Sequence, residues 1–420
     1  MKFSFLINSL EGGGAENQGR LLCRTLQPEK IFVLSGKLPP DFPNAEILTG
    51  LNPFRNFLDR GNFNLRLYSN LLSEKIKKGN TLISFMERAN FTNILSKSRS
   101  GHRAVICERI TPSREFSGIR ALLNKPLIKK LYPKADLVVA NSFGVKEDLS
   151  QNSAINPHKI EVIYNMYDIE EIETQARKNI KSKEEIFFHP AIINAGRITF
   201  QKGQNHLLRI FHAAKKEMPK LKLIILGSGL QKTELNKLAA DMKLKAYDGE
   251  TQNVPTREHD IYFLGHTKNP YKYISRAVLF ISTSLWEGFP NALVEAMICG
   301  TPVISSDIAS GPREILAPGT PFFEKTDAPE FAEFGVLMPP FSSWKQREEE
   351  KERLWAKTIL DLIDSPKKLR GYRERGRERG KDFSVKKIIS QWKKIILNSC
   401  LLYTSPSPRD LSTSRMPSSA

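Results

Sequence analysis

Residues 2–26 read KFSFLINSLEGGGAENQGRLLCRTL, and this stretch decides the fold that we expect for the chain. An apolar run with strand character leads through the glycines of EGGGAE into a segment whose leucines recur at helical spacing. A strand, a glycine turn and an amphipathic helix in this order form the first unit of a Rossmann-like domain.

The same alternation continues along the chain and then starts a second time. Strand-like runs follow at KIFVLSG, TLISFM, AVICER, DLVVANS and IEVIYN, and KNIKSKEE at residues 178–185 reads as a polar linker. Beyond the linker come IINAGR, LKLIILGSG, IYFLGH, AVLFISTS and TPVISSD, with helical segments between the first of them. Strands that alternate with helices predict parallel, doubly wound sheets. We therefore expect an α/β fold of two Rossmann-like domains that face each other across a cleft.

The charge of the chain indicates anionic partners. Its 420 residues carry a formal charge of +19, and residues 366–394 hold twelve Lys and Arg against three Asp and Glu. Residues 109–134 interleave seven basic residues with apolar ones, namely Phe116, Ile119, Leu122, Leu123, Leu127 and Ile128. This mixture suits a helix on an anionic membrane surface, and it equally suits a solvated helical face packed on the domain. No recognition module accompanies the charge, so we expect no nucleic-acid partner.

Cysteine and histidine usage bounds the compartment and the metal content. The four cysteines form no CxxC pair and the seven histidines form no cluster with metal-ligand spacing. This pattern predicts a reducing cytosol and no structural zinc. No apolar run approaches the roughly 18 residues that a spanning helix needs. We expect a cytoplasmic protein, or one that is peripheral on the cytoplasmic face of the inner membrane.

The run EGFPNALVEAMICGTPVIS, residues 287–305, predicts an anion site. Pro290 suits the first turn of a helix that Gly300 ends, and Asn291 shares a face of this helix with Glu295. Free backbone amides at the helix start, with the helix dipole, can take a diphosphate. The carboxylates of Glu287 and Glu295 would then accept hydrogen bonds from sugar hydroxyls. An ordinary helix-start acid would explain Glu287, but it does not explain Glu295 inside an apolar segment.

Residues 287–316 resemble the donor-site motif of the glycosyl transferases group 1 family, which are retaining glycosyltransferases of family 4 with a GT-B fold. Their E-x7-E pattern matches Glu287 and Glu295. Other family segments follow in order: EGGGAE, VIYN, NAGRITFQKG, IILGSG and FLGHTKNPYKYISRA. The resemblance reaches about residue 398 and extends to a subset that assembles cell-surface polysaccharides or lipid-linked oligosaccharides.

The resemblance implies a role for each matching residue. Arg197 and Lys202 would grip the donor diphosphate and act with Glu287 as the catalytic set, while Glu295 would hold the ribose. The wider donor site would include Gly13, Gly14, Gly196, Gly265, Gly288, Phe289, Pro290, Asn291 and Ala292. The chain has no D-x-D motif, so we expect no cofactor and no metal.

The acceptor side departs from the family pattern, because no histidine ends the strand AVICER. Glu108 and Arg109 stand there instead, and Glu87 after SFM is a further acceptor-side candidate. His102 precedes the strand, where we expect a solvated loop residue.

The domain boundaries follow from the same resemblance. Residues 1–176 would form the acceptor-side domain, 177–382 the donor domain, and 383–398 a helix that crosses back to the first domain. Residues 401–420 are rich in Ser, Pro and Arg and read as a disordered, non-native tail.

The expected activity is transfer of a hexose or N-acetylhexosamine from a nucleotide-diphosphate sugar to a glycan or lipid-linked acceptor. A UDP-sugar is the favoured donor, and a GDP-sugar is the alternative. A GT-B epimerase or phosphorylase would keep the fold and change the reaction. A nicotinamide-dependent oxidoreductase is disfavoured because EGGGAE lacks the G-x-G-x-x-G spacing. A basic binding protein without catalysis would explain the charge but not the two glutamates.

Overall fold

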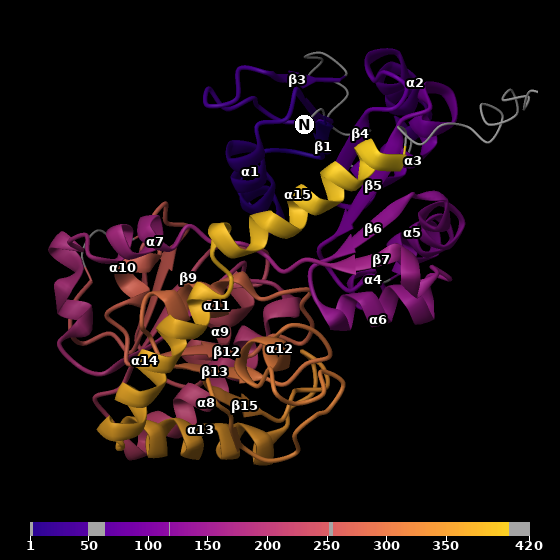
Figure 1. Ribbon diagram of the computed structural model, residues 1–420. Coiled ribbons are helices and arrows are strands. Elements are labelled where there is room, and N and C mark those ends of the chain that lie inside the picture. The colour runs from indigo at the N-terminus through magenta and orange to yellow at the C-terminus, as the bar shows by residue number, and fades with distance from the viewer. Residues whose placement is uncertain (1–2, 49–63, 117, 252–254, 403–420) are drawn as a thin grey trace, which may run out of the picture. The chain divides into compact units, whose positions relative to one another are not determined.

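The computed structural model describes residues 3–48, 64–116, 118–251 and 255–402 (Figure 1). This part of the chain divides into two compact units. The first unit takes the chain up to Cys107, Leu127–Val139 and the chain from Ile389 on. The second takes Glu108–Pro126 and Ala140–Ile388.

The first sheet has the strand order β3-β2-β1-β4-β5-β6-β7. Its strands are β1 (Phe3–Ile7), β2 (Lys30–Val33), β3 (Ala45–Ile47), β4 (Thr81–Phe85), β5 (Arg103–Glu108), β6 (Leu137–Ala140) and β7 (Ile160–Val162). β1 lies between β2 and β4 and is parallel to both, with Phe5 opposite Ile31 on one side and Ile83 on the other. The predicted strands are confirmed, and β3, only three residues long, was not predicted.

The second sheet has the order β10-β11-β9-β8-β12-β13-β15-β14. Its strands are β8 (Ala191–Ala195), β9 (Lys222–Leu226), β10 (Ala246–Asp248), β11 (Ile261–Gly265), β12 (Leu279–Ser282), β13 (Val303–Ser306), β14 (Glu330–Phe331) and β15 (Val336–Met338). Only the β14–β15 pair is antiparallel among the described residues. The two α/β sheets confirm the predicted fold class.

Side chains of the second sheet alternate between two buried cores. Ile193, Phe280 and Val303 join one hydrophobic cluster. Their neighbours Ile192 and Ile281 join the other. Because successive side chains of a strand point to opposite faces, both faces of this sheet must be covered. This explains why its strands read as continuous apolar runs.

Helices connect the strands of both sheets. Those before the second sheet are α1 (Gly14–Leu26), α2 (Leu65–Lys75), α3 (Glu87–Ser100), α4 (Pro112–Glu115), α5 (Gly118–Leu131), α6 (Phe143–Asn152) and α7 (Ile169–Ala176). Those after β8 are α8 (Gln204–Glu217), α9 (Lys232–Asp241), α10 (Tyr271–Ile274), α11 (Asn291–Ile298), α12 (Pro312–Leu316), α13 (Glu349–Ile363), α14 (Pro366–Lys381) and α15 (Val385–Leu402). α8 and α13 pack together, and α11 packs on α14.

The stretch predicted as a polar linker is not a plain loop. Its second half lies in a 3-10 helix, Lys181–Phe187. Ile180 and Ile186 are buried in the same core cluster as α11. The charges of KNIKSKEE favoured a loop, but Ile180 within this stretch and Ile186 just after it are buried and anchor the segment.

His102 is buried rather than solvated, so this prediction was wrong. Its ring is 1% exposed, with Nε2 2.8 Å from Oδ1 of Asn93 and Nδ1 2.5 Å from Oγ of Ser100. Burial lowers the pKa of His102 to about 4, so the ring is neutral at physiological pH. The short loop before β5 carries the ring into the space between β5 and α3, where polar partners satisfy it.

The last helix, α15, belongs to the first unit from Ile389 on and packs there. The ring of Trp392 is buried, with its centroid 6.1 Å from that of Phe85. Nη1 of Arg103 donates to the carbonyl of Ile395 at 2.9 Å. The helix includes Leu401 and Leu402, and the rest of the predicted disordered tail lies outside the described residues.

No helix in the described ranges combines the length and the apolar character that a membrane span requires.

Candidate donor-binding site

Several of the predicted site residues lie at or beside the start of α11, in the second unit. Pro290 takes the position just before the helix, one residue earlier than a first-turn proline. The helix ends at Ile298, and Gly300, two residues further on, has a φ of +73°. A Cβ at Gly300 would lie 2.4 Å from Nε of Arg377, so only glycine fits this end.

Lys202 and Glu287 form a short ion pair. Lys202 ends a 3-10 turn that follows β8, and its Nζ lies 2.5 Å from Oε1 of Glu287. Oγ of Ser284 donates to the same carboxylate oxygen at 2.7 Å. Glu287 is only 6% exposed, so this pair is little screened by water. A cation and a carboxylate thus lie side by side at the loop that leads into α11.

The backbone of Glu287 is fixed as firmly as its side chain. Its carbonyl accepts hydrogen bonds from Oγ1 of Thr111, at 2.7 Å, and from the hydroxyl of Ser310. The two hydroxyls also lie 3.0 Å from each other. These contacts connect the loop after β5 with the loop before α12, and they hold the Glu287 peptide between them.

Glu295 lies one turn into α11, within range of the charge of the same lysine. Burial raises the pKa of its carboxyl to about 7, while the charge of Lys202 and a hydrogen bond from Tyr271 act in the opposite direction. Lys202 therefore acts electrostatically on both glutamates of the E-x7-E pattern. A ligand group that donates hydrogen bonds to Glu295 would favour its ionised form.

Arg197 differs from Lys202, although both follow β8. Its side chain is exposed, and it forms no side-chain bond or ion pair with any described residue. Gly196, with a φ of +156°, leaves room beside the stem of Lys202, because a Cβ there would lie 3.3 Å from Cε. Gly265 ends β11 with a φ of +67°. The structure thus brings Lys202, Glu287 and Glu295 together and leaves Arg197 in solvent.

Three of the predicted donor-site residues, Gly288, Phe289 and Ala292, contribute to the packing of the second unit. A Cβ at Gly288 would lie 2.3 Å from the carbonyl oxygen of Arg109. The buried ring of Phe289 packs against Tyr164 and Phe383, with centroids 5.4 and 5.5 Å away. Ala292 packs against the core cluster of the same unit. The side chain of Phe289 is therefore not available to a ligand, whereas Ala292 is half-buried.

A polar network that the sequence did not predict holds Asn291, the first residue of α11. Its Oδ1 accepts from Nδ2 of Asn165 at 2.7 Å and from the hydroxyl of Tyr167 at 2.6 Å. Asn165 in turn accepts from Nη1 of Arg109 at 2.7 Å. The available signal was the polar and aromatic run Tyr164–Tyr167 at the carboxyl end of β7.

The remaining candidates lie at other strand ends. Glu108 ends β5, is 1% exposed, and accepts from the backbone N–H of Arg109 at 3.0 Å. Arg109 is also buried. Gly13 caps α1 and Gly14 begins it. A Cβ at Gly13 would overlap the carboxylate of Glu16, so a larger residue there would require this side chain to move.

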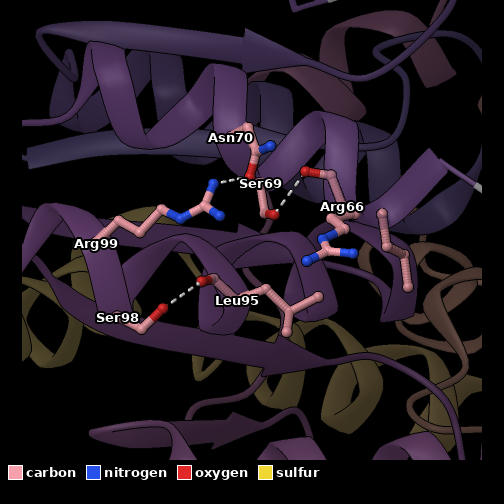
Figure 2. A pocket seen from close by; sticks show the side chains of 7 residues that line it. Arg66, Ser69, Asn70, Leu95, Ser98 and Arg99 are labelled. Atoms are coloured by element: carbon pink, nitrogen blue, oxygen red, sulfur yellow. Dashed lines mark hydrogen bonds between the residues drawn. The ribbon is translucent and has the colours of Figure 1, made fainter.

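In the first unit, Glu87 begins α3. A cavity of about 470 Å³ lies between α2 and α3, lined by Leu65, Arg66, Ser69, Asn70, Leu95, Ser98 and Arg99 (Figure 2). None of the predicted site residues lines it. Among the described residues, no group of three or more His, Cys, Asp or Glu is placed so that it could hold a metal ion.

Two family models match consecutive parts of the chain. The model of Glycosyltransferase Family 4 matches residues 12–171, and that of Glycosyl transferases group 1 matches residues 172–333. An uncharacterized glycosyltransferase of Methanocaldococcus jannaschii is 33% identical over 72% of this chain and 74% of its own. The chain therefore belongs to the group 1 glycosyltransferases.

A second relative matches over nearly its full length. It is the N-acetylgalactosamine-N,N'-diacetylbacillosaminyl-diphospho-undecaprenol 4-alpha-N-acetylgalactosaminyltransferase of Campylobacter jejuni. It is 30% identical over 94% of this chain and 99% of its own. The lipopolysaccharide 1,6-galactosyltransferase of Salmonella typhimurium is 29% identical over 44% of this chain and 46% of its own.

Solved structures confirm the GT-B fold class. Anabaena HepE, crystallised with UDP and glucose, has a TM-score of 0.72 at 18% identity, over 95% of this chain and all of that one. Sucrose-phosphate synthase of Thermosynechococcus elongatus has a TM-score of 0.71 at 17% identity, over 96% of this chain and all of that one.

Proposed function

We propose that the protein is a retaining hexosyltransferase. It would move a hexose or N-acetylhexosamine from a nucleotide-diphosphate sugar to a hydroxyl of a glycan or lipid-linked acceptor. The observation that carries the proposal is Lys202, which lies 2.5 Å from Glu287 and acts on Glu295 at the start of α11. A cation that acts on two carboxylates, beside free helix amides, matches a ligand with a diphosphate between two hydroxyl-bearing groups.

Each residue has a part in this proposal. Lys202 and the exposed Arg197 bind the diphosphate oxygens and stabilise the charge that grows on them as the sugar leaves. Glu287 accepts hydrogen bonds from hydroxyls of the transferred sugar, and Glu295 accepts them from the ribose. When the donor binds, Lys202 keeps its bond to Glu287 and turns its other N–H donors to the diphosphate, because an ammonium has three donors.

The proposed reaction is a displacement on one face of the sugar. The bond between the anomeric carbon and the phosphate oxygen breaks, and the nucleoside diphosphate takes the electron pair. The acceptor oxygen bonds to that carbon on the same face, and its proton passes to the departing phosphate oxygen. The cations named above neutralise the leaving group, so we propose that transfer is metal-independent.

Relatives support the donor and acceptor classes. HepE was crystallised with UDP and with UDP-glucose, which favours a UDP-sugar over a GDP-sugar as the donor. The Campylobacter relative is named for a diphospho-undecaprenol substrate, and the Salmonella relative for lipopolysaccharide. We infer a lipid-linked or glycan acceptor of cell-surface polysaccharide assembly, held by residues up to 176, while residues 177–382 hold the donor.

A peripheral contact with an anionic membrane would bring the enzyme to such an acceptor. In α5, Leu122 is 75% exposed and Leu123 is 52% exposed, beside the exposed Lys125. The membrane face predicted for residues 109–134 is narrower than expected, since Phe116 and Ile128 are buried within the protein. We propose that the two leucines and neighbouring lysines touch the cytoplasmic face of the inner membrane.

A thermal-shift screen tests the nucleotide preference directly. UDP-, GDP- and ADP-sugars are added to the purified protein, and the base that raises the unfolding temperature is the donor base. Product analysis with that sugar then separates the reactions. Transfer should require an added acceptor, whereas an epimerase would convert the donor alone and a phosphorylase would require phosphate. If none of the nucleotide sugars raises the unfolding temperature, the proposal is contradicted.

A further inference from the structure

Three polar side chains lie in series beside the start of α11. Nη1 of Arg109 donates to Oδ1 of Asn165 at 2.7 Å, and Nδ2 of Asn165 donates to Oδ1 of Asn291 at 2.7 Å. Arg109 and Asn165 are both buried, whereas Asn291 is half-buried. The series therefore runs from the protein interior to a residue that a ligand can reach.

The chemistry of arginine determines the direction of every bond in this series. A guanidinium has donors and no acceptor, so Asn165 must turn its carbonyl oxygen toward Arg109. The amide of Asn165 then offers its NH₂ group to Asn291, which must answer with its own carbonyl oxygen. The hydroxyl of Tyr167 donates to this same oxygen at 2.6 Å. An asparagine could present either end of its amide, and here only one orientation satisfies its neighbours.

The consequence appears at the far end of the series. Both side-chain hydrogen bonds of Asn291 are accepted by its Oδ1, and no described residue accepts a hydrogen bond from its Nδ2. Its NH₂ group is thus turned away from Asn165 and Tyr167. It belongs to the first residue of α11, next to the helix amides and one turn from Glu295, on which the charge of Lys202 acts. An NH₂ group in this place adds donors to a site that already favours anions.

We propose that Arg109 and Asn165 are positioning residues that fix the amide of Asn291 with its donors toward the diphosphate of the sugar nucleotide. This inference rests on the proposed function. It also assigns Arg109 a different part from the acceptor contact that the sequence indicated, because the buried guanidinium acts through two amides. No contact between Arg109 and the substrate is needed.

The substitution Asn165→Asp tests the series and keeps a side chain of similar size and shape at this position. An aspartate accepts from Arg109 as before, but it can only accept from Asn291. Asn291 must then reverse, and its carbonyl oxygen faces the diphosphate instead of its NH₂ group. The diphosphate then loses a hydrogen bond from the NH₂ group and meets a carbonyl oxygen in its place. We therefore expect UDP to bind about 10- to 100-fold more weakly. Uridine, which lacks phosphates, should bind as it does to the wild type.

Two further variants separate orientation from simple loss of contacts. Tyr167→Phe removes one bond to Asn291 without reversing the amide, so UDP affinity should fall less than about fivefold. Asn291→Ala removes the amide, and the double variant Asn165→Asp with Asn291→Ala should bind UDP no more weakly than Asn291→Ala alone. This non-additivity is expected only if Asn165 acts through Asn291.

Calorimetric titration with UDP and uridine provides the measurement, with unfolding temperatures recorded for each variant. If another base stabilises the wild type, its diphosphate and nucleoside replace these probes. The inference fails if Asn165→Asp binds UDP as the wild type does, if it loses UDP and uridine equally, or if the two substitutions are additive. Failure of the wild type to bind any nucleoside diphosphate would instead defeat the proposed function, and the inference with it.

Discussion

Nζ of Lys202 lies 2.5 Å from Oε1 of Glu287, although 85 residues separate them in the sequence. The lysine comes from the turn after β8 and the glutamate from the loop after β12, and the two strands are neighbours in the second sheet. Parallel strands place their carboxyl ends at one edge of a sheet, so the two loops meet there. This pair is the centre of the candidate site.

Lys202→Ala and Glu287→Ala should each lower the rate of sugar transfer at least about 100-fold, because each removes charge that the reacting sugar diphosphate contacts. The folded protein should persist, as judged by its circular dichroism. Lys232→Ala is the matched control, since Lys232 is also a poorly exposed lysine paired with carboxylates in this unit. Wild-type turnover in either site variant would contradict the catalytic assignment.

Glu295 should make stability depend on pH. Its carboxyl has a pKa raised by burial from 4.5 to about 7, so the folded protein keeps a proton that the unfolded chain has already lost. Stability therefore falls as pH rises through this window, and the loss is complete above about pH 7. Glu295→Gln removes the ionisation, so its unfolding temperature should fall less between pH 5 and pH 8 than that of the wild type. Equal slopes for the two proteins would refute the assignment.

Glu314→Ala should destabilise the second unit. The buried carboxylate of Glu314 accepts from the backbone N–H groups of Phe143 and Gly144, at 2.7 and 3.0 Å, at the start of α6. Alanine leaves these donors unsatisfied, which predicts a loss of roughly 2–4 kcal/mol in the free energy of unfolding. Glu350→Ala, at an exposed acid in α13, should change it by less than about 0.5 kcal/mol. Denaturant unfolding curves for the three proteins measure both effects.

Replacing Leu122 and Leu123 by serine should weaken binding to anionic vesicles about fivefold or more, because both side chains are available to enter the interface. Leu230→Ser is the control, at a leucine that is 93% exposed in the glycine turn after β9. Sedimentation with phosphatidylglycerol vesicles measures the bound fraction, and high salt should lower it for the wild type. Equal sedimentation of the wild type with neutral and anionic vesicles would count against a membrane contact.

Local sequence patterns determined much of this protein. Short apolar runs, some of them followed by glycine turns, predicted most of the strands, because both faces of a parallel sheet are buried. The short strands β3, β10, β14 and β15 escaped prediction, whereas β7, which is also only three residues long, was predicted from IEVIYN. The glutamate pattern and the glycine turns identified the family before any contact was known.

The tertiary structure decided which residues act on one another. His102 reads as a loop residue from its neighbours, but partners in α3 keep it buried and neutral. Arg197 and Lys202 look equivalent in GRITFQKG, and only the folded loop pairs Lys202 with Glu287 and leaves Arg197 exposed. The orientation of Asn291 depends on Arg109, which is distant in the chain. Sequence spacing determines local conformation, whereas hydrogen bonds and burial between distant segments exist only once the chain is folded.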